Sequence, residues 1–128
     1  MAEMNVELVS VERQVWSGPA TQVIVRTVEG DVGVLPGHAP LLAELKEGFS
    51  ARIQEPSGNE ISVALHGGFL SVTKDRVSIL AEDAQLSGEI DVAAARAVYD
   101  EERRHADGEE SAEMLRARAQ LMAAGHDV

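Results

Sequence analysis

The chain has 128 residues, 45% hydrophobic and 26% charged, a composition typical of one globular domain or of a small domain with an appendage. Its formal net charge of −11 argues against binding to nucleic acid or to an anionic lipid surface. No apolar run approaches the roughly 20 residues that cross a bilayer, so we expect no direct membrane insertion. The chain has no cysteine, which excludes disulfides and a cysteine nucleophile.

The first part of the chain combines short β-branched runs with turn residues. All four prolines and nine of the eleven glycines precede Glu89. Runs such as ISVAL at 61–65 and VSIL at 77–80 alternate apolar and polar residues, which is the period of a half-buried strand. Turn chemistry separates the runs, as in WSGPA, EPSGNE and TKDR. This pattern predicts an antiparallel β-sandwich or barrel.

The composition then becomes rich in alanine, which divides the chain into residues 1–86 and 87–128. The second part is predicted to be a helical hairpin whose first helix has Asp91 as its N-cap. Asp107 stands at capping-box spacing from a glutamate before the second helix, which should end at Gly125. The apolar stripes of both helices are thin and bury little area, so a mobile hairpin and a permanently packed one both fit the pattern.

Residues that could carry catalysis are sparse. His38 stands among glycines and prolines in GDVGVLPGHAPLLAELKEG, but a catalytic histidine needs a nucleophile or an orienting carboxylate, and the sequence identifies neither. The other three histidines lack metal-ligand spacing, so we expect no metal site. The glycine pairs in GDVG and HGGF lack the remainder of a phosphate-binding loop and indicate bulges or tight turns between strands. An enzyme based on His38 is therefore the least supported alternative.

Arg118 is the unusual charge of the second part. On a helical wheel it falls within the apolar stripe of the second helix, where a charge requires a partner. That partner is either an acid of the first helix, such as Glu101 or Glu102, or an anion on another molecule. The same two interpretations apply to the other arginines of the hairpin, for which solvation is the default: Arg96, Arg103, Arg104 and Arg116.

Two motifs in order closely resemble the epsilon subunit of bacterial F-type ATP synthases. They are the pattern G-[DE]-x-G-[IV]-x-P-x-H-x-P-L at 30–41 and the segment HGGFLSVTKDRVSILAEDA at 66–84, followed by an acidic, alanine-rich helix pair. The resemblance implies a β-sandwich of about ten strands with a C-terminal antiparallel helical hairpin. It also implies a non-catalytic central-stalk subunit, peripheral on the cytoplasmic face of the cell membrane. Its partners would be the gamma subunit, the c-subunit ring and the alpha/beta catalytic head.

The resemblance also suggests roles for individual residues. Asp31 and His38 would lie at the end that faces the c-ring, where an acid can pair with a basic residue of the ring. The hairpin would inhibit ATP hydrolysis by extending toward the catalytic head, with the head contacted by its arginines: Arg96, Arg103, Arg104, Arg116 and Arg118. Some relatives bind ATP through an Ile/Leu-Asp-x-x-Arg-Ala motif, which is incomplete here. No cofactor is therefore expected, and Asp91 and Arg118 are the remaining candidates for contact with ATP.

One alternative function stays open at this point. The chain could be a free-standing cytoplasmic β-sandwich module that binds proteins, with the hairpin as an interaction helix pair. Ile24, Leu42 and Leu70 should contribute either to the core or to the contact with gamma, and the alternation of the strands does not separate these two roles.

Overall fold

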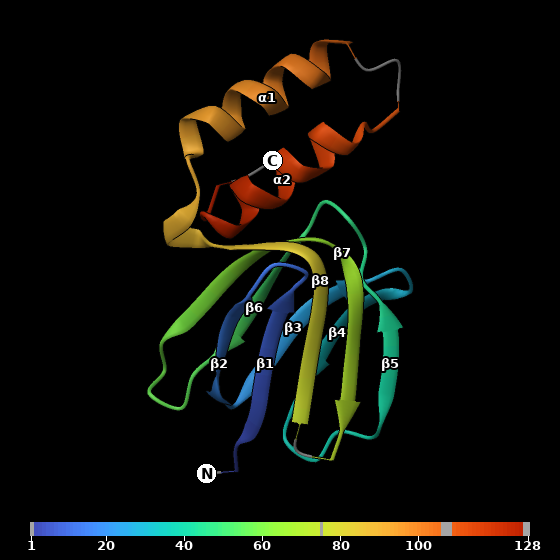
Figure 1. Ribbon diagram of the computed structural model, residues 1–128, viewed down its shortest axis with the longest axis vertical. Coiled ribbons are helices and arrows are strands. Elements are labelled where there is room, and N and C mark those ends of the chain that lie inside the picture. Colours follow the sequence, from blue (N-terminus) through green and yellow to red (C-terminus); the bar gives the residue numbers. More distant parts are fainter. Residues whose placement is uncertain (1, 75, 106–108, 127–128) are drawn as a thin grey trace.

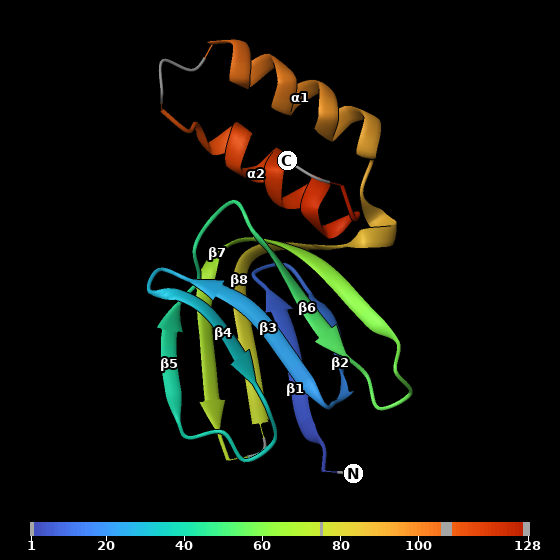
Figure 2. The same cartoon turned by 180° about the vertical axis from the view of Figure 1, so that it is seen from behind.

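The structure is a computed structural model and describes residues 2–74, 76–105 and 109–126. It contains a β-rich part and a pair of helices stacked at one end of it (Figures 1 and 2). The elements, in chain order, are β1 (Met4–Ser10), β2 (Gln14–Ala20), β3 (Gln22–Thr27), β4 (Gly30–Val34), β5 (Leu41–Glu44), β6 (Ser50–Gln54), β7 (Glu60–Thr73), β8 (Arg76–Leu86), the 3-10 turn η1 (Ser87–Glu89), α1 (Val92–His105) and α2 (Ala112–Ala123).

Neighbouring strands are hydrogen-bonded in the order β2-β1-β8-β7-β6-β3-β4, and β5 pairs separately with β7. The sheet folds over into two facing layers (Figure 2). The predicted sandwich and hairpin are confirmed, with eight strands in the described residues. The strands are fewer than expected because the runs EISVALH and FLSVT form the single long strand β7. One strand pair departs from the antiparallel pattern, since β1 runs parallel to β8.

A bend inside β7 turns the sheet from one layer to the other. The first half of β7 pairs with β6 and its second half with β5. Gly67 and Gly68 lie between the two halves with φ of 69° and 124°, a region open to glycine. A Cβ on Gly68 would lie 2.7 Å from the Cα of Ala81 and closer still to the carbonyl oxygen of Leu80. Of the two expectations for the HGGF segment, a bulge or a tight turn between strands, the structure has an irregularity within one strand and no turn between strands.

The core lies between the two layers and is almost entirely aliphatic. Its largest side chains with no exposed surface are Leu8, Ile53, Leu70 and Ile79. Alternation on β1 and β3 places every second residue in this core, as the period of the sequence predicts. Leu70 belongs to the core, whereas Leu42 is 74% exposed and is available to a partner.

Both helices begin at a side-chain cap. The Asp91 carboxylate accepts a hydrogen bond from the Ala94 amide across 3.0 Å, which confirms the predicted N-cap of α1. The Ser111 hydroxyl accepts one from the Met114 amide across 3.1 Å and caps α2. The cap predicted at Asp107 falls outside the described residues.

The end of α2 has the predicted glycine. Gly125 has φ of 88°, and its amide donates to the carbonyl oxygen of Met122 across 3.0 Å. The His126 amide donates to Leu121 across 2.9 Å, which completes a Schellman motif. In the described part of the chain, neither α1 nor α2 combines the length and the apolar character that a bilayer crossing requires.

Candidate binding surfaces

Small side chains hold the hairpin against the sandwich. Helix α2 lies between α1 and the strands (Figures 1 and 2). On the strand side, Ala119 and Ala123 pack with Ala64 of β7, and on the other side Ala117 and Leu121 pack with Ala95 and Tyr99 of α1. Alanines allow the elements to approach closely but bury little area, so this docking interface between α2 and the sandwich is weak per residue.

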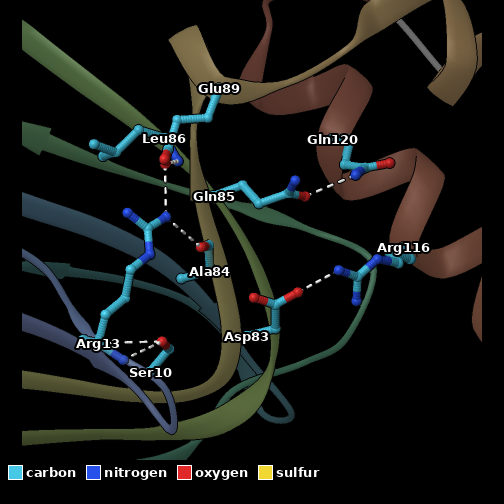
Figure 3. A network of polar contacts seen from close by, with 9 residues as sticks. All are labelled: Ser10, Arg13, Asp83, Ala84, Gln85, Leu86, Glu89, Arg116 and Gln120. Atoms are coloured by element: carbon cyan, nitrogen blue, oxygen red, sulfur yellow. Dashed lines mark hydrogen bonds and ion pairs between the residues drawn. The ribbon is translucent and has the colours of Figure 1, made fainter.

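Polar contacts between α2 and β8 also hold the docking interface together (Figure 3). Arg116 of α2 forms an ion pair with Asp83 of β8. One turn further along α2, the Gln120 amide donates to Gln85 across 2.7 Å. Asp83 and Gln85 are alternate residues near the end of β8, so this end of the strand holds α2.

The segment after β8 is also anchored to the sandwich, through a residue that follows β1 (Figure 3). Arg13, which follows β1, donates to the Glu89 carboxylate across 2.8 Å, and that carboxylate also accepts the Leu86 amide across 3.0 Å. The hydrogen bond from Arg13, and next that from Leu86, lowers the pKa of Glu89. The chain between the sandwich and the hairpin is therefore fixed as far as Glu89.

Arg118 has a different partner from the one expected. Its Nε donates to the carbonyl oxygen of Gly48 across 2.9 Å, and its guanidinium lies 4.6 Å from the ring centre of Phe49. It also pairs with Glu110, just before α2, so the predicted pair with Glu101 or Glu102 was wrong. The side chain is only 17% exposed, which is compatible with a charge because Nε donates to Gly48 and Nη1 donates to Glu110.

The remaining arginines of the hairpin are on α1. Arg104 pairs with Glu101, and Arg103 lies 5.6 Å from the ring centre of Tyr99. Arg96 is half-buried and also interacts within the chain. Of the arginines predicted to meet a catalytic head, Arg116 and Arg118 therefore face the sandwich.

The structure separates Asp31 from His38. Asp31 lies at the start of β4 opposite Arg26 of β3, and the hydrogen bond from Arg26 lowers its pKa. Its side chain is 67% exposed. His38 follows the other end of β4, where its Nδ1 lies 2.7 Å from the carbonyl oxygen of Ala39. The β3–β4 turn is on the hairpin side and the β4–β5 connection is at the far end (Figure 2).

The two candidates for ATP contact are also apart. Asp91 borders a groove between β8 and the helices, whereas Arg118 borders a cavity against β3 and β6. Asp91 already caps α1 and Arg118 already bonds Gly48. Within the described residues, no group of acidic and histidine side chains has the geometry to hold a metal ion.

His66 is a half-buried titratable group that the sequence did not single out. It lies at the β7 bend beneath α2, and its Nε2 has no hydrogen-bond partner in the described structure. Burial, and next the nearby charge of Arg116, lowers its pKa from 6.5 to about 4. His66 is therefore neutral at physiological pH and belongs to the docking interface.

The outer face of the sandwich exposes a cluster of large apolar side chains. We define the apolar face by Val11, Leu42, Phe69 and Leu80, which are 50% to 83% exposed. Phe69 and Leu80 are cross-strand neighbours, and Val11 joins them along a groove of about 350 Å³. An exposed apolar cluster of this kind marks a surface for protein contact.

The fold and these surfaces define a class of protein with an N-terminal β-sandwich, a C-terminal helical hairpin and an apolar face for a partner. The model of the family described as "ATP synthase, Delta/Epsilon chain, beta-sandwich domain" matches residues 3–87. The chain belongs to the ATP synthase epsilon chain family, as its relatives show.

Two relatives, each named ATP synthase epsilon chain, represent the match. The one from Rhodococcus opacus (strain B4) is 56% identical over 101 residues, 79% of this chain and 83% of the relative. The one from Mycobacterium avium (strain 104) is 43% identical over 125 residues, 98% of both chains. A chain in the Euglena gracilis mitochondrial ATP synthase (OSCP/F1/c-ring) has the same fold, with a TM-score of 0.75 at 23% identity, covering 94% of this chain and 76% of that chain.

Proposed function

We propose that this chain is a central-stalk subunit of a bacterial F-type ATP synthase, which couples rotation of the c-ring to ATP synthesis through gamma. The observation that carries the proposal is the 43% identity to an ATP synthase epsilon chain across 98% of both chains, sandwich and hairpin together. Because the likeness includes both parts, it favours the stalk subunit over a free-standing binding module. The subunit has no active site and no cofactor of its own in this proposal.

The gamma subunit is the proposed occupant of the apolar face. Leu42 and Val11 are 74% and 83% exposed, and burying large aliphatic side chains contributes about 1.5–3 kcal/mol each. A stalk subunit must turn with gamma, which requires a contact that persists through rotation. The exposed apolar side chains support such a contact, because their burial does not depend on one ion pair.

The c-ring contact is assigned to Asp31. Its carboxylate is exposed and carries full charge, because Arg26 lowers its pKa. A basic group of the ring can therefore form an ion pair with the same carboxylate. His38 is at the other end of β4, and its bond to Ala39 favours a role in shaping the β4–β5 connection. This division replaces the single surface that the sequence suggested for the two residues.

The hairpin is the proposed inhibitory element. Its contact with the sandwich uses small side chains and a few polar bonds, which supports release toward the alpha/beta head. Arg96, Arg103 and Arg104 would then meet acidic groups of the head, together with Arg116 and Arg118 once these leave the sandwich. Deleting residues 89–128 should raise ATP hydrolysis by the assembled complex, whereas unchanged hydrolysis would remove the inhibitory role.

We place the boundary between the two working parts at 86/87, which gives domains 1–86 and 87–128. The end of β8 at Leu86 and the end of the family match at residue 87 support this position. The subunit would be a peripheral part of the membrane-associated complex, on its cytoplasmic face.

The direct test is to isolate the tagged full-length chain from its own cells and identify what accompanies it. Gamma, c and the alpha/beta subunits should co-purify in fixed proportion. A chain recovered with none of them, from cells whose ATP synthase is intact, would favour the free-standing module instead.

A further inference from the structure

Positive charge gathers around one aromatic ring in a chain that is strongly acidic overall. Four of the eleven lysine and arginine residues surround Phe49 or the cavity beside it: Arg26, Lys46, Arg52 and Arg118. The cavity has a volume of about 600 Å³ and lies between β3, β6 and the end of α2. Asp31 is the acid among its described lining residues, against three arginines. Because Arg26 pairs with Asp31 and Arg118 pairs with Glu110, the excess positive charge at the cavity comes from Arg52 and the nearby Lys46.

Two of the arginines are held in place before any ligand binds. The guanidinium groups of Arg26 and Arg118 each lie 4.6 Å from the ring centre of Phe49. Arg26 is further fixed by Asp31, and Arg118 by the Gly48 carbonyl oxygen across 2.9 Å. Fixed side chains lose little conformational freedom on binding, which favours affinity for a small charged ligand.

Donors remain available at this cavity. Arg52, whose charge also contributes to lowering the pKa of Asp31, donates no hydrogen bond to the described residues, and neither do Arg26 Nη1 and Arg118 Nη2. The Ser50 hydroxyl lies on the same wall. Guanidinium groups bind phosphate oxygens through paired, charge-assisted hydrogen bonds, so this set of donors suits an oxyanion with several charges.

We propose that this cavity binds a small polyvalent oxyanion of the phosphate class, such as pyrophosphate, a site that goes beyond the proposed function. Two guanidinium groups already stack on Phe49, so the ring has no room for a nucleobase, and the oxyanion alone carries recognition. The cavity includes Arg118, one of the two candidates for ATP contact, but not Asp91, and its other arginines, Arg26 and Arg52, come from the sandwich and not from the family motif.

Calorimetric titration of the full-length chain with pyrophosphate at low ionic strength tests the site. Arg52→Gln should weaken binding about tenfold or more, which is the loss expected when one charge-assisted contact is removed. Arg76→Gln, an exposed arginine on β8 away from the cavity, is the matched control and should change Kd by less than about twofold. Circular dichroism verifies that both variants fold. Equal weakening by both variants, or no saturable binding below about 10 mM, would overturn the proposal.

A second comparison tests the ligand class. Inorganic triphosphate and ATP should bind with similar affinity, because the base finds no ring to stack on. Amide resonances of Ser50 and Arg52 should shift with either ligand. Binding of ATP more than about tenfold tighter than triphosphate would contradict an oxyanion site and indicate a nucleotide site instead.

Discussion

Arg118 of α2 donates a hydrogen bond to the carbonyl oxygen of Gly48 across 2.9 Å and so ties the hairpin to the connection between β5 and β6. The surrounding contacts of α2 are mostly alanines, whose burial adds little. The bond from Arg118, whose side chain is only 17% exposed, therefore holds the hairpin in its docked position together with the contacts of Arg116 and Gln120 to β8.

Replacing this arginine should loosen the hairpin without unfolding the sandwich. Arg118→Ala removes the bond to Gly48, the contact with Phe49 and the pair with Glu110, for a combined loss of about 2 kcal/mol in docking free energy. Amide hydrogen exchange of α2 should accelerate about 30-fold, while β7 and β8 keep their protection. Arg104→Ala, which breaks an exposed pair within α1, is the control and should leave α2 unchanged. Unaltered exchange in Arg118→Ala would contradict this role.

His66 should make the docked state sensitive to acid. The fold lowers its pKa from 6.5 to about 4, so the unfolded chain takes up this proton first as pH falls. The contribution of neutral His66 to the free energy of unfolding is intact above pH 6.5 and is lost progressively toward pH 4. The shift corresponds to at most about 3 kcal/mol, and partial solvent access reduces this to about 2 kcal/mol.

Denaturant unfolding from pH 7 to pH 4.5 measures this effect. His66→Gln cannot take up the proton, so its free energy of unfolding should decline less than that of the natural chain. The two proteins have the same carboxylates, so the effect of carboxylate protonation on the free energy of unfolding cancels in the comparison. Parallel pH profiles for the two proteins, or a His66 ring resonance that titrates near pH 6.5, would show that the burial argument is wrong.

The bend in β7 should tolerate no side chain at Gly68. An added Cβ would collide with the backbone of Leu80 and Ala81 at a positive φ, so Gly68→Ala should lower the free energy of unfolding by about 3 kcal/mol or more. Gly88→Ala meets no atom within 4 Å and is the control, with a change within about 0.5 kcal/mol. Equal thermal stability of the two variants would contradict a steric requirement at the bend.

Local patterns predicted much of the fold. The alternation on β1 and β3, the cap at Asp91 and the glycine at 125 all depend on neighbours within a few residues, and the structure confirms them. The sequence left a bulge and a turn equally open at Gly67 and Gly68, because glycine pairs occur in both. Only the pairing of β7 with both β5 and β6, which is long-range, distinguishes the two.

The candidate surfaces depended more on tertiary contacts. Arg118 was correctly singled out by its place in an apolar stripe, but its partner, the Gly48 carbonyl, is 70 residues away and has no sequence signal. Leu42 and Leu70 look alike in sequence, yet one is exposed and the other buried. Asp31 and His38 are seven residues apart, and the strand between them carries them to opposite ends of the sandwich.

The different roles proposed for Asp31 and His38 can be tested in the assembled enzyme. Asp31→Lys reverses the charge proposed to meet the c-ring and should reduce proton-driven ATP synthesis several-fold, because a like charge then faces a basic group. His38→Ala changes only the β4–β5 connection and should leave synthesis near its natural rate. The opposite ranking of the two variants would place the ring contact at the far end of the sandwich.

The central claim is that the subunit joins the stalk through its apolar face, and co-purification with gamma tests it most directly. Leu80→Asp, at 50% exposure on the apolar face, should fold normally and lose gamma together with the alpha/beta head. Val28→Asp, at 54% exposure in the β3–β4 turn, carries the same new charge away from that face and should retain both. Retention of gamma by Leu80→Asp, with or without loss in Val28→Asp, would contradict the account.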